Sequence, residues 1–106
     1  AKQLIQTISA SKTLGFKRVV FIEYPRAGLL AVGFVTNSIE DQASHKRYAI
    51  VFLPTPPNPI NGMFVFVPEN EVVESNLTIE DGIKLVMSAG MVASNNISMR
   101  RGEKSD

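Results

Sequence analysis

The feature that most constrains the fold is a proline-rich segment, Thr55–Gly62, set between two apolar runs that favour β-strand. Three of its eight residues are proline. Proline fixes φ near about −65° and has no backbone N–H, and the residue before each proline is biased away from helix. Gly62 then allows a tight turn back toward the strand. We therefore expect a rigid loop that joins two strands, Arg47–Leu53 and Met63–Val67.

A second pair of apolar runs lies upstream. Val19–Tyr24 and Leu29–Thr36 are separated by Pro25–Gly28, in which proline sets the first corner and Gly28 permits a positive φ. Such a short connection favours antiparallel neighbours. The run Leu29–Thr36 is almost continuously apolar, so we expect it to be buried on both faces, with a possible bulge at Gly33.

One helix is signalled clearly. Thr78 is typical of an N-cap, and Asp81, three residues later, completes a capping box. An apolar stripe follows at helical spacing: Ile79, Ile83, Val86 and Met87. Gly90 is the expected C′ residue that ends the helix. Outside it, Asn37–Lys46 indicates a polar loop and Val72–Glu74 a short strand.

Together these elements predict an α+β domain, built on a small, curved, mostly antiparallel β-sheet or partial barrel of about five strands with one main helix. Weak amphipathicity predicts a helical lead-in, so we divide the chain into a connector at 1–13, a globular domain at 14–93 and a flexible tail at 94–106. A length of 106 residues suits one domain. With no cysteine, the chain has neither a disulfide framework nor a cysteine-based zinc site.

Charge is distributed unevenly. Residues 1–47 carry a net charge of +4, whereas residues 48–99 carry −4. Two interpretations stay open: the basic half faces an anionic lipid or phosphate, or the two sets of charges meet across the fold. Nucleic-acid binding is not expected, because the basic residues neither cluster nor alternate with exposed aromatic residues.

No residue pattern indicates a reaction centre. His45 is the only histidine, and no cysteine or carboxylate stands at ligand spacing from it. Ser88 lacks the strand-turn-helix context of a nucleophile elbow. The acidic residues Glu69, Glu71 and Glu74 surround a turn and are expected to be solvated. We therefore expect no catalytic residue, no metal and no cofactor, and enzymatic activity is the less favoured hypothesis.

Several blocks in a fixed order carry a family resemblance: Val19–Gly28, Gly33–Thr36, Val51–Pro59 with Gly62, Phe66–Pro68 with Val72, Thr78–Gly82 and Ser88–Gly90. In this order and spacing, they resemble domain-of-unknown-function family 502, the proteins similar to the plant continuous vascular ring (COV) membrane proteins. The resemblance runs from about Lys2 to Val92. Ala89 departs from it, because the family more often has a Gly-Gly pair there.

The resemblance implies a membrane context that composition does not show. Family members typically carry two transmembrane helices before this domain, with a short helical connector leading out of the bilayer. The chain would then be an excised part, the soluble C-terminal domain of a small integral membrane protein of the cell membrane, cytoplasmic in bacterial members. No catalytic residues or cofactors are defined for the family.

The leading functional hypothesis is a membrane-tethered interaction or regulatory module, because rigid turns lose little entropy on binding. Its candidate surface comprises ten residues of two turns: Tyr24, Pro25, Arg26, Gly28, Thr55, Pro56, Pro57, Asn58, Pro59 and Gly62. Its partner would be a protein or, by self-association through Leu29–Thr36, a second copy. The same turns could instead be architectural corners. The rival hypothesis is a small-molecule or anion-binding domain, or a hydrolase, with a pocket between the proline segment and Thr78–Asp81.

Overall fold

The computed structural model describes residues 15–56, 58–93 and 96–101. In this part of the chain, six strands and one α-helix form an α+β fold, which confirms the predicted class. The elements are β1 (Arg18–Glu23), β2 (Leu30–Glu40), β3 (Arg47–Thr55), β4 (Asn58–Pro68), the 3₁₀ turn η1 (Glu69–Glu71), β5 (Val73–Ser75), α3 (Ile79–Met87) and β6 (Met99–Arg101). The predicted helical connector at 1–13 lies outside the described residues.

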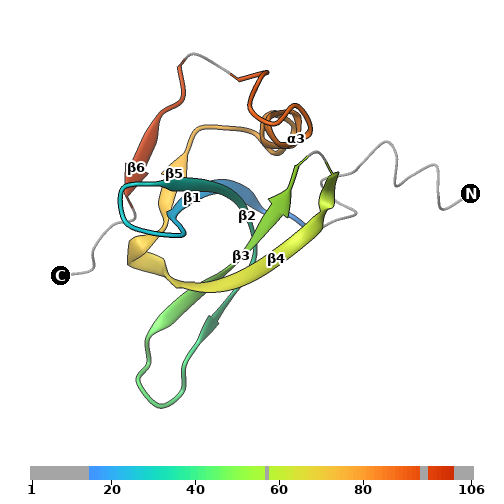
Figure 1. Ribbon diagram of the computed structural model, residues 1–106. Helices are drawn as coiled ribbons and strands as arrows, with labels where there is room; N and C mark the ends of the chain where they lie inside the picture. The colour runs from blue at the N-terminus through green and yellow to red at the C-terminus, as the bar shows by residue number, and fades with distance from the viewer. Residues whose placement is uncertain (1–14, 57, 94–95, 102–106) are drawn as a thin grey trace, which may run out of the picture.

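The strands form one sheet in the order β4-β3-β2-β1-β5-β6, and every neighbouring pair is antiparallel. Short connections between successive strands produce the β1–β2–β3–β4 meander. The sheet curls strongly, as Figure 1 shows, with α3 on the outside of the curl. Because β4 and β6 are the two ends of the strand order, the sheet is open and does not close into a barrel.

The concave face of the sheet holds the larger part of the core. Alternation along β1 sends Val20 and Ile22 to this face. They pack with buried residues of the neighbouring strands and of the segment before β5: Val35, Ala49, Val51, Leu53 and Val72. The half-buried Val65 and Val67 of β4 cover this cluster from the opposite side of the curl.

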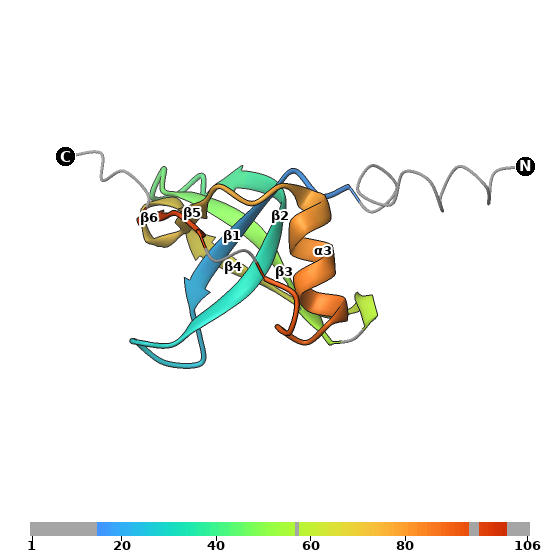
Figure 2. The same ribbon diagram turned by 90° about the horizontal axis from the view of Figure 1, so that it is seen from above.

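The convex face is covered by α3, which Figure 2 shows lying beside β1 and β2. Val19 and Phe34 point to this side and pack against Val86 of the helix. Phe16 stacks on Phe34 with 4.3 Å between ring centroids. The helix approaches closely at Gly82, where a Cβ atom would collide with the Val19 and Phe34 side chains.

β2 is longer than the sequence predicts. It continues to Glu40, so residues 37–40 belong to a strand and not to the expected polar loop. The predicted bulge is present in β2, but it lies at the register shift between Val35 and Asn37 and not at Gly33. Gly33 has a different role, because the side chain of Val51 occupies the space that its Cβ atom would need.

The loop at the proline segment is also shorter than predicted, because strands occupy most of the segment. β3 extends through Thr55 and β4 already begins at Asn58. The pairing shifts from Pro54↔Gly62 to Thr55↔Asn58, so the extra residues of β4 bulge out of the ladder. Gly62 lies within β4 and makes no tight turn; it is required because the carbonyl oxygen of Leu53 occupies its Cβ position.

Part of the expected flexible tail is structured. Residues 99–101 form β6, which pairs with β5 and adds the sixth strand. The Asn76 side-chain oxygen accepts a hydrogen bond from the Ser98 backbone N–H at 3.0 Å. The backbone N–H of Asn76 donates to the Ser98 carbonyl at 3.2 Å. Such non-local pairing has no signature in a short polar sequence, which explains the error.

The helix begins where the sequence predicts, but its C′ residue lies one position earlier than predicted. The Thr78 hydroxyl accepts a hydrogen bond from the Asp81 N–H at 3.0 Å, and the capping box is complete. At the C-terminus the left-handed C′ position is held by Ala89, with φ of 55°, rather than by Gly90. The Ala89 and Gly90 N–H groups donate to the carbonyls of Val86 and Leu85, as in a Schellman motif.

Candidate functional site

The β1–β2 turn is a fixed, fully exposed structure. The Tyr24 N–H donates to the Leu29 carbonyl at 3.1 Å, and the Leu29 N–H donates to the Arg26 carbonyl at 3.3 Å. The Tyr24–Pro25 peptide bond is cis, and Gly28 has φ of +94°, as expected for its position in the turn. The two hydrogen bonds close the turn between the paired ends of β1 and β2.

Arg26 is the charged group of this turn. Its guanidinium donates through Nη1 to the carbonyl of Ala27 at 3.0 Å, which holds the side chain over the turn. Within the described residues, no carboxylate forms an ion pair with it. Large apolar side chains flank the turn on the surface, with Tyr24, Leu29 and Leu30 each 40–45% exposed.

The proline segment forms the end of the β3–β4 hairpin. Thr55, Pro56 and Asn58 are exposed, while Pro57 and the side chain of Pro59 fall outside the described structure. The Asn58 side-chain oxygen accepts a hydrogen bond from the Ile60 N–H at 3.0 Å. Asparagine thereby supports the backbone locally, as it does in many turns.

Among the described residues, one side-chain contact links the first predicted turn to the neighbourhood of the second. The hydroxyl of Tyr24 donates to the sulfur of Met63, next to Gly62, at 3.6 Å. The β1–β2 turn and the β3–β4 hairpin end otherwise lie at opposite ends of the molecule in both Figure 1 and Figure 2. The structure therefore does not assemble the ten predicted residues into one continuous surface.

A hollow is present in the described structure, but not where the sequence analysis placed the pocket. An open cavity of about 580 Å³ lies between the end of β1, the second half of β4 and η1. Its lining includes Ile22, Val65 and Val67, and the exposed residues Glu23, Tyr24 and Glu71. The acids and the tyrosine make its edge polar over an apolar interior.

The pocket predicted between the proline segment and the helix N-terminus is not formed by the described residues. A hollow of about 180 Å³ reaches Ile60, lined also by Phe16, Thr36 and Phe52. A separate one of about 50 Å³ reaches Asp81. Neither hollow is lined by residues of both segments.

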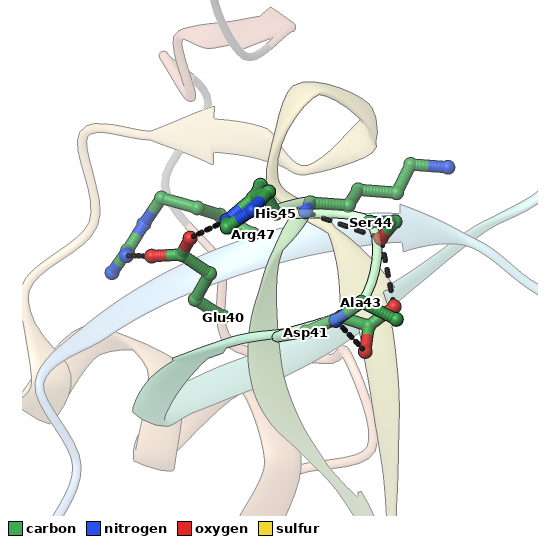
Figure 3. A network of polar contacts seen from close by, with 7 residues as sticks. Glu40, Asp41, Ala43, Ser44, His45 and Arg47 are labelled. Carbon is green, nitrogen blue, oxygen red and sulfur yellow. Dashed lines mark hydrogen bonds and ion pairs between the residues drawn. The ribbon is translucent and has the colours of Figure 1, made fainter.

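The β2–β3 turn contains a polar network that the sequence did not predict (Figure 3). The Asp41 carboxylate accepts hydrogen bonds from the Ser44 hydroxyl at 2.7 Å and the Ala43 N–H at 3.3 Å. These bonds lower the pKa of the Asp41 carboxyl. His45 has φ of 60°, and its Nδ1 lies 3.0 Å from a Glu40 oxygen.

This network stabilises a turn and shows no features of a metal centre. No group of three or more potential metal ligands occurs among the described residues. The Glu40 carboxylate at the end of β2 also lies 3.5 Å from Arg47 Nη1 at the start of β3. The network therefore closes the β2–β3 hairpin electrostatically.

Several charges meet across the fold. Arg18 of β1 and Glu74 of β5 form a two-bond fork at 2.9 and 3.0 Å. The hydrogen bond to Glu74 raises the pKa of the Arg18 guanidinium. Arg47 likewise reaches Glu69 at 3.7 Å. Arg18 and Arg47 therefore fit the interpretation in which the basic and acidic halves of the chain meet across the fold.

The other reactive groups weighed from the sequence have structural roles. The Ser88 hydroxyl donates to the Leu85 carbonyl at 3.3 Å and accepts from the Val92 N–H at 2.9 Å, so it closes the end of α3. Two of the three turn acids, Glu69 and Glu74, form ion pairs with arginine. None of these groups is placed as a nucleophile or an acid–base pair.

Comparison with known proteins identifies the family. The model of the family described as "Protein of unknown function (DUF502)" matches residues 1–61. The chain belongs to this family. Among curated proteins, Protein LIKE COV 2 of Arabidopsis thaliana is 36% identical over 92% of this chain and 38% of its own length. Protein CONTINUOUS VASCULAR RING 1 of the same plant is 34% identical over 86% of this chain and 35% of its own length.

The chain spans little more than a third of the length of these relatives. No solved structure matches it. Within the part of the chain that the structure describes, no helix is both long enough and apolar enough to span a membrane.

The conformation of the β1–β2 turn depends on Gly28. Gly28→Val is expected to reduce the free energy of unfolding by about 1–3 kcal/mol, because a β-branched residue is strained at this positive φ. Space is not the cause, since the nearest atom to an added Cβ is Arg26 Nη1 at 3.7 Å. Urea denaturation measures the change. Ala27→Val, at the exposed neighbouring position, is the matched control, and equal stability of the two variants would contradict the turn assignment.

Proposed function

We propose that this DUF502 domain is the cytoplasmic part of an integral membrane protein and acts as an interaction or regulatory module. In this proposal the membrane segments precede residue 1, and the domain presents its β1–β2 turn to a partner that bears an acidic group. The names of the relatives and the short share of their length that the chain covers support a larger protein of which this is one domain.

The observation that carries the proposal is the state of Arg26. Arg18 and Arg47 form ion pairs with glutamates of neighbouring elements. Arg26 lies on an exposed turn, and no carboxylate of the described residues forms an ion pair with it. A guanidinium can bind a carboxylate or phosphate in a two-bond fork. Exposed Tyr24 and Leu29 beside it supply apolar contact area, and tyrosine and arginine are enriched where binding energy concentrates in interfaces.

The position of the turn favours a partner away from the membrane anchor. Residues 1–14 join the described chain at Gly15, before β1, whereas the turn follows the other end of β1. A six-residue strand is about 20 Å long at about 3.3 Å per residue. Lys17 therefore lies near the side where a tether would enter, and Arg26 lies at the far end.

A site-specific cross-link in the full-length protein tests the partner surface. A photoreactive residue at Ala27 is expected to capture a partner in cells, and Arg26→Glu to reduce its yield at least about fivefold by reversing one charge of the pair. Lys46→Glu, a charge reversal on the β2–β3 turn, is the matched control and should leave the yield unchanged.

The cross-linking result can contradict the proposal directly. A photoreactive residue at Ala43, on the β2–β3 turn, reports the background of non-specific capture. If Ala27 captures no more than Ala43, or if the captured species is indifferent to Arg26→Glu, then the turn is an architectural corner.

Liposome binding tests whether the tether side also contacts lipid. The chain is expected to bind anionic vesicles weakly, with binding that fades as salt rises, because the Debye length falls to about 8 Å at 0.15 M. Lys17→Glu should weaken binding, since one basic residue near such a surface contributes on the order of 1 kcal/mol. Arg26→Glu should have little effect. Equal binding to neutral and anionic vesicles, or none to either, would exclude electrostatic docking on this side.

The cytoplasmic placement has its own test. Because the chain contains no cysteine, one cysteine introduced at exposed Ala43 provides a unique label in the full-length protein once any cysteines outside this chain are replaced. A membrane-impermeant maleimide is expected to label it only after the cells are lysed. Labelling in intact cells would place the domain on the outer side.

A further inference from the structure

The edge strand β4 differs from ordinary sheet edges. It pairs only with β3 among the described strands, and its eleven residues include no charge. Exposed edges are usually protected from pairing by charged residues, prolines, bulges or short length. Here Pro59 with the bulge at residues 59–61 protects one end of β4 and Pro68 the other, so residues 63–67 form an unprotected, regularly paired stretch between them.

The opposite edge of the sheet shows the contrast. β6 is three residues long and carries Arg100 and Arg101. A short, basic strand is a poor template for pairing, because it offers few backbone groups and repels a second basic strand. Of the two edges in the described sheet, β4 alone is long and uncharged.

The side chains of β4 add an apolar outer face to this open edge. Phe64 and Phe66 are 60% and 51% exposed, and their ring centroids lie 6.1 Å apart. They pair with Phe52 and Ile50 of β3, which continue the apolar surface on the same face. The intervening Val65 points to the concave core. A stable monomer gains nothing from exposing such aromatic residues beside an open edge.

We propose that a second copy of this chain pairs with β4 in antiparallel orientation, so that the two sheets join edge to edge about a twofold axis. Because β4 is uncharged, pairing with itself brings no like charges opposite one another. In a register centred on Val65, Phe64 would face Phe66 of the partner subunit. Pairing of β4 with β6 would instead leave most of the edge open and would generate an unclosed chain of molecules.

A mixing experiment tests self-pairing without assuming a register. Sedimentation equilibrium of the chain from about 1 µM to 1 mM is expected to show a monomer–dimer equilibrium. The variants Phe64→Lys/Phe66→Lys and Phe64→Glu/Phe66→Glu should each dimerise at least about tenfold more weakly, since like charges then oppose each other. An equimolar mixture of the two should restore a dimer containing one copy of each.

Two controls separate edge pairing from other effects. Met91→Lys, at a residue 89% exposed beyond α3, adds a charge elsewhere on the surface and should leave dimerisation unchanged. Amide hydrogen exchange should show protection at residues 63–67 that increases with protein concentration, while residues 41–46 of the β2–β3 turn stay unaffected. Circular dichroism of each variant verifies that it is folded.

Defined results would overturn the proposal. A chain that stays monomeric over the whole concentration range would overturn the proposal, even if β4 then proved to bind the strand of a different protein. A dimer indifferent to both charged variants, or one that forms without new amide protection in β4, would place the interface elsewhere. The measurement uses no membrane and no acidic partner, so it does not depend on the proposed role of Arg26.

Discussion

The structure depends on the burial of one strand pair from both sides. β1 and β2 alternate their side chains so that Val20 and Val35 enter the concave core while Val19 and Phe34 lie under α3. Each such side chain contributes on the order of 1.5–3 kcal/mol when it leaves water. Both layers use the same two strands, so the β3–β4 hairpin and the helix are positioned by one central scaffold. The β1–β2 turn is the direct connection between these strands.

Ion pairs between neighbouring elements engage some of the basic side chains on the surface and not others. Arg18 ties β1 to β5 through Glu74, and Arg47 joins Glu40 and Glu69 near the β2–β3 turn. Exposed pairs of this kind contribute little to stability, about 0–1 kcal/mol each. Their consequence is selective: Arg18 and Arg47 are paired where elements meet, whereas Arg26 on the β1–β2 turn has no carboxylate partner among the described residues.

Local sequence signals were sufficient to predict the fold class and the helix. Thr78 and Asp81 cap α3 as predicted, because a capping box is formed within four residues and needs no tertiary partner. The proline segment was predicted less well. Its residues favour a loop locally, yet from Asn58 onward they pair with β3, since hydrogen bonds to a neighbouring strand outweigh a weak local preference. The same competition extends β2 to Glu40 and hides β6 in a polar stretch.

The sequence by itself determined the central parts of β1 to β5, the helix α3 and the positive φ at Gly28, because backbone preference and side-chain periodicity act over a few residues. It also marked Arg26 as a turn cation. Only the tertiary structure decided that, among the described residues, Arg18 and Arg47 have carboxylate partners while Arg26 has none, that the cavity adjoins Tyr24 and Glu71, and that β4 is an edge strand of the described sheet. These properties follow from the order in which distant strands pair, and that order is set by the burial of both faces of β1 and β2.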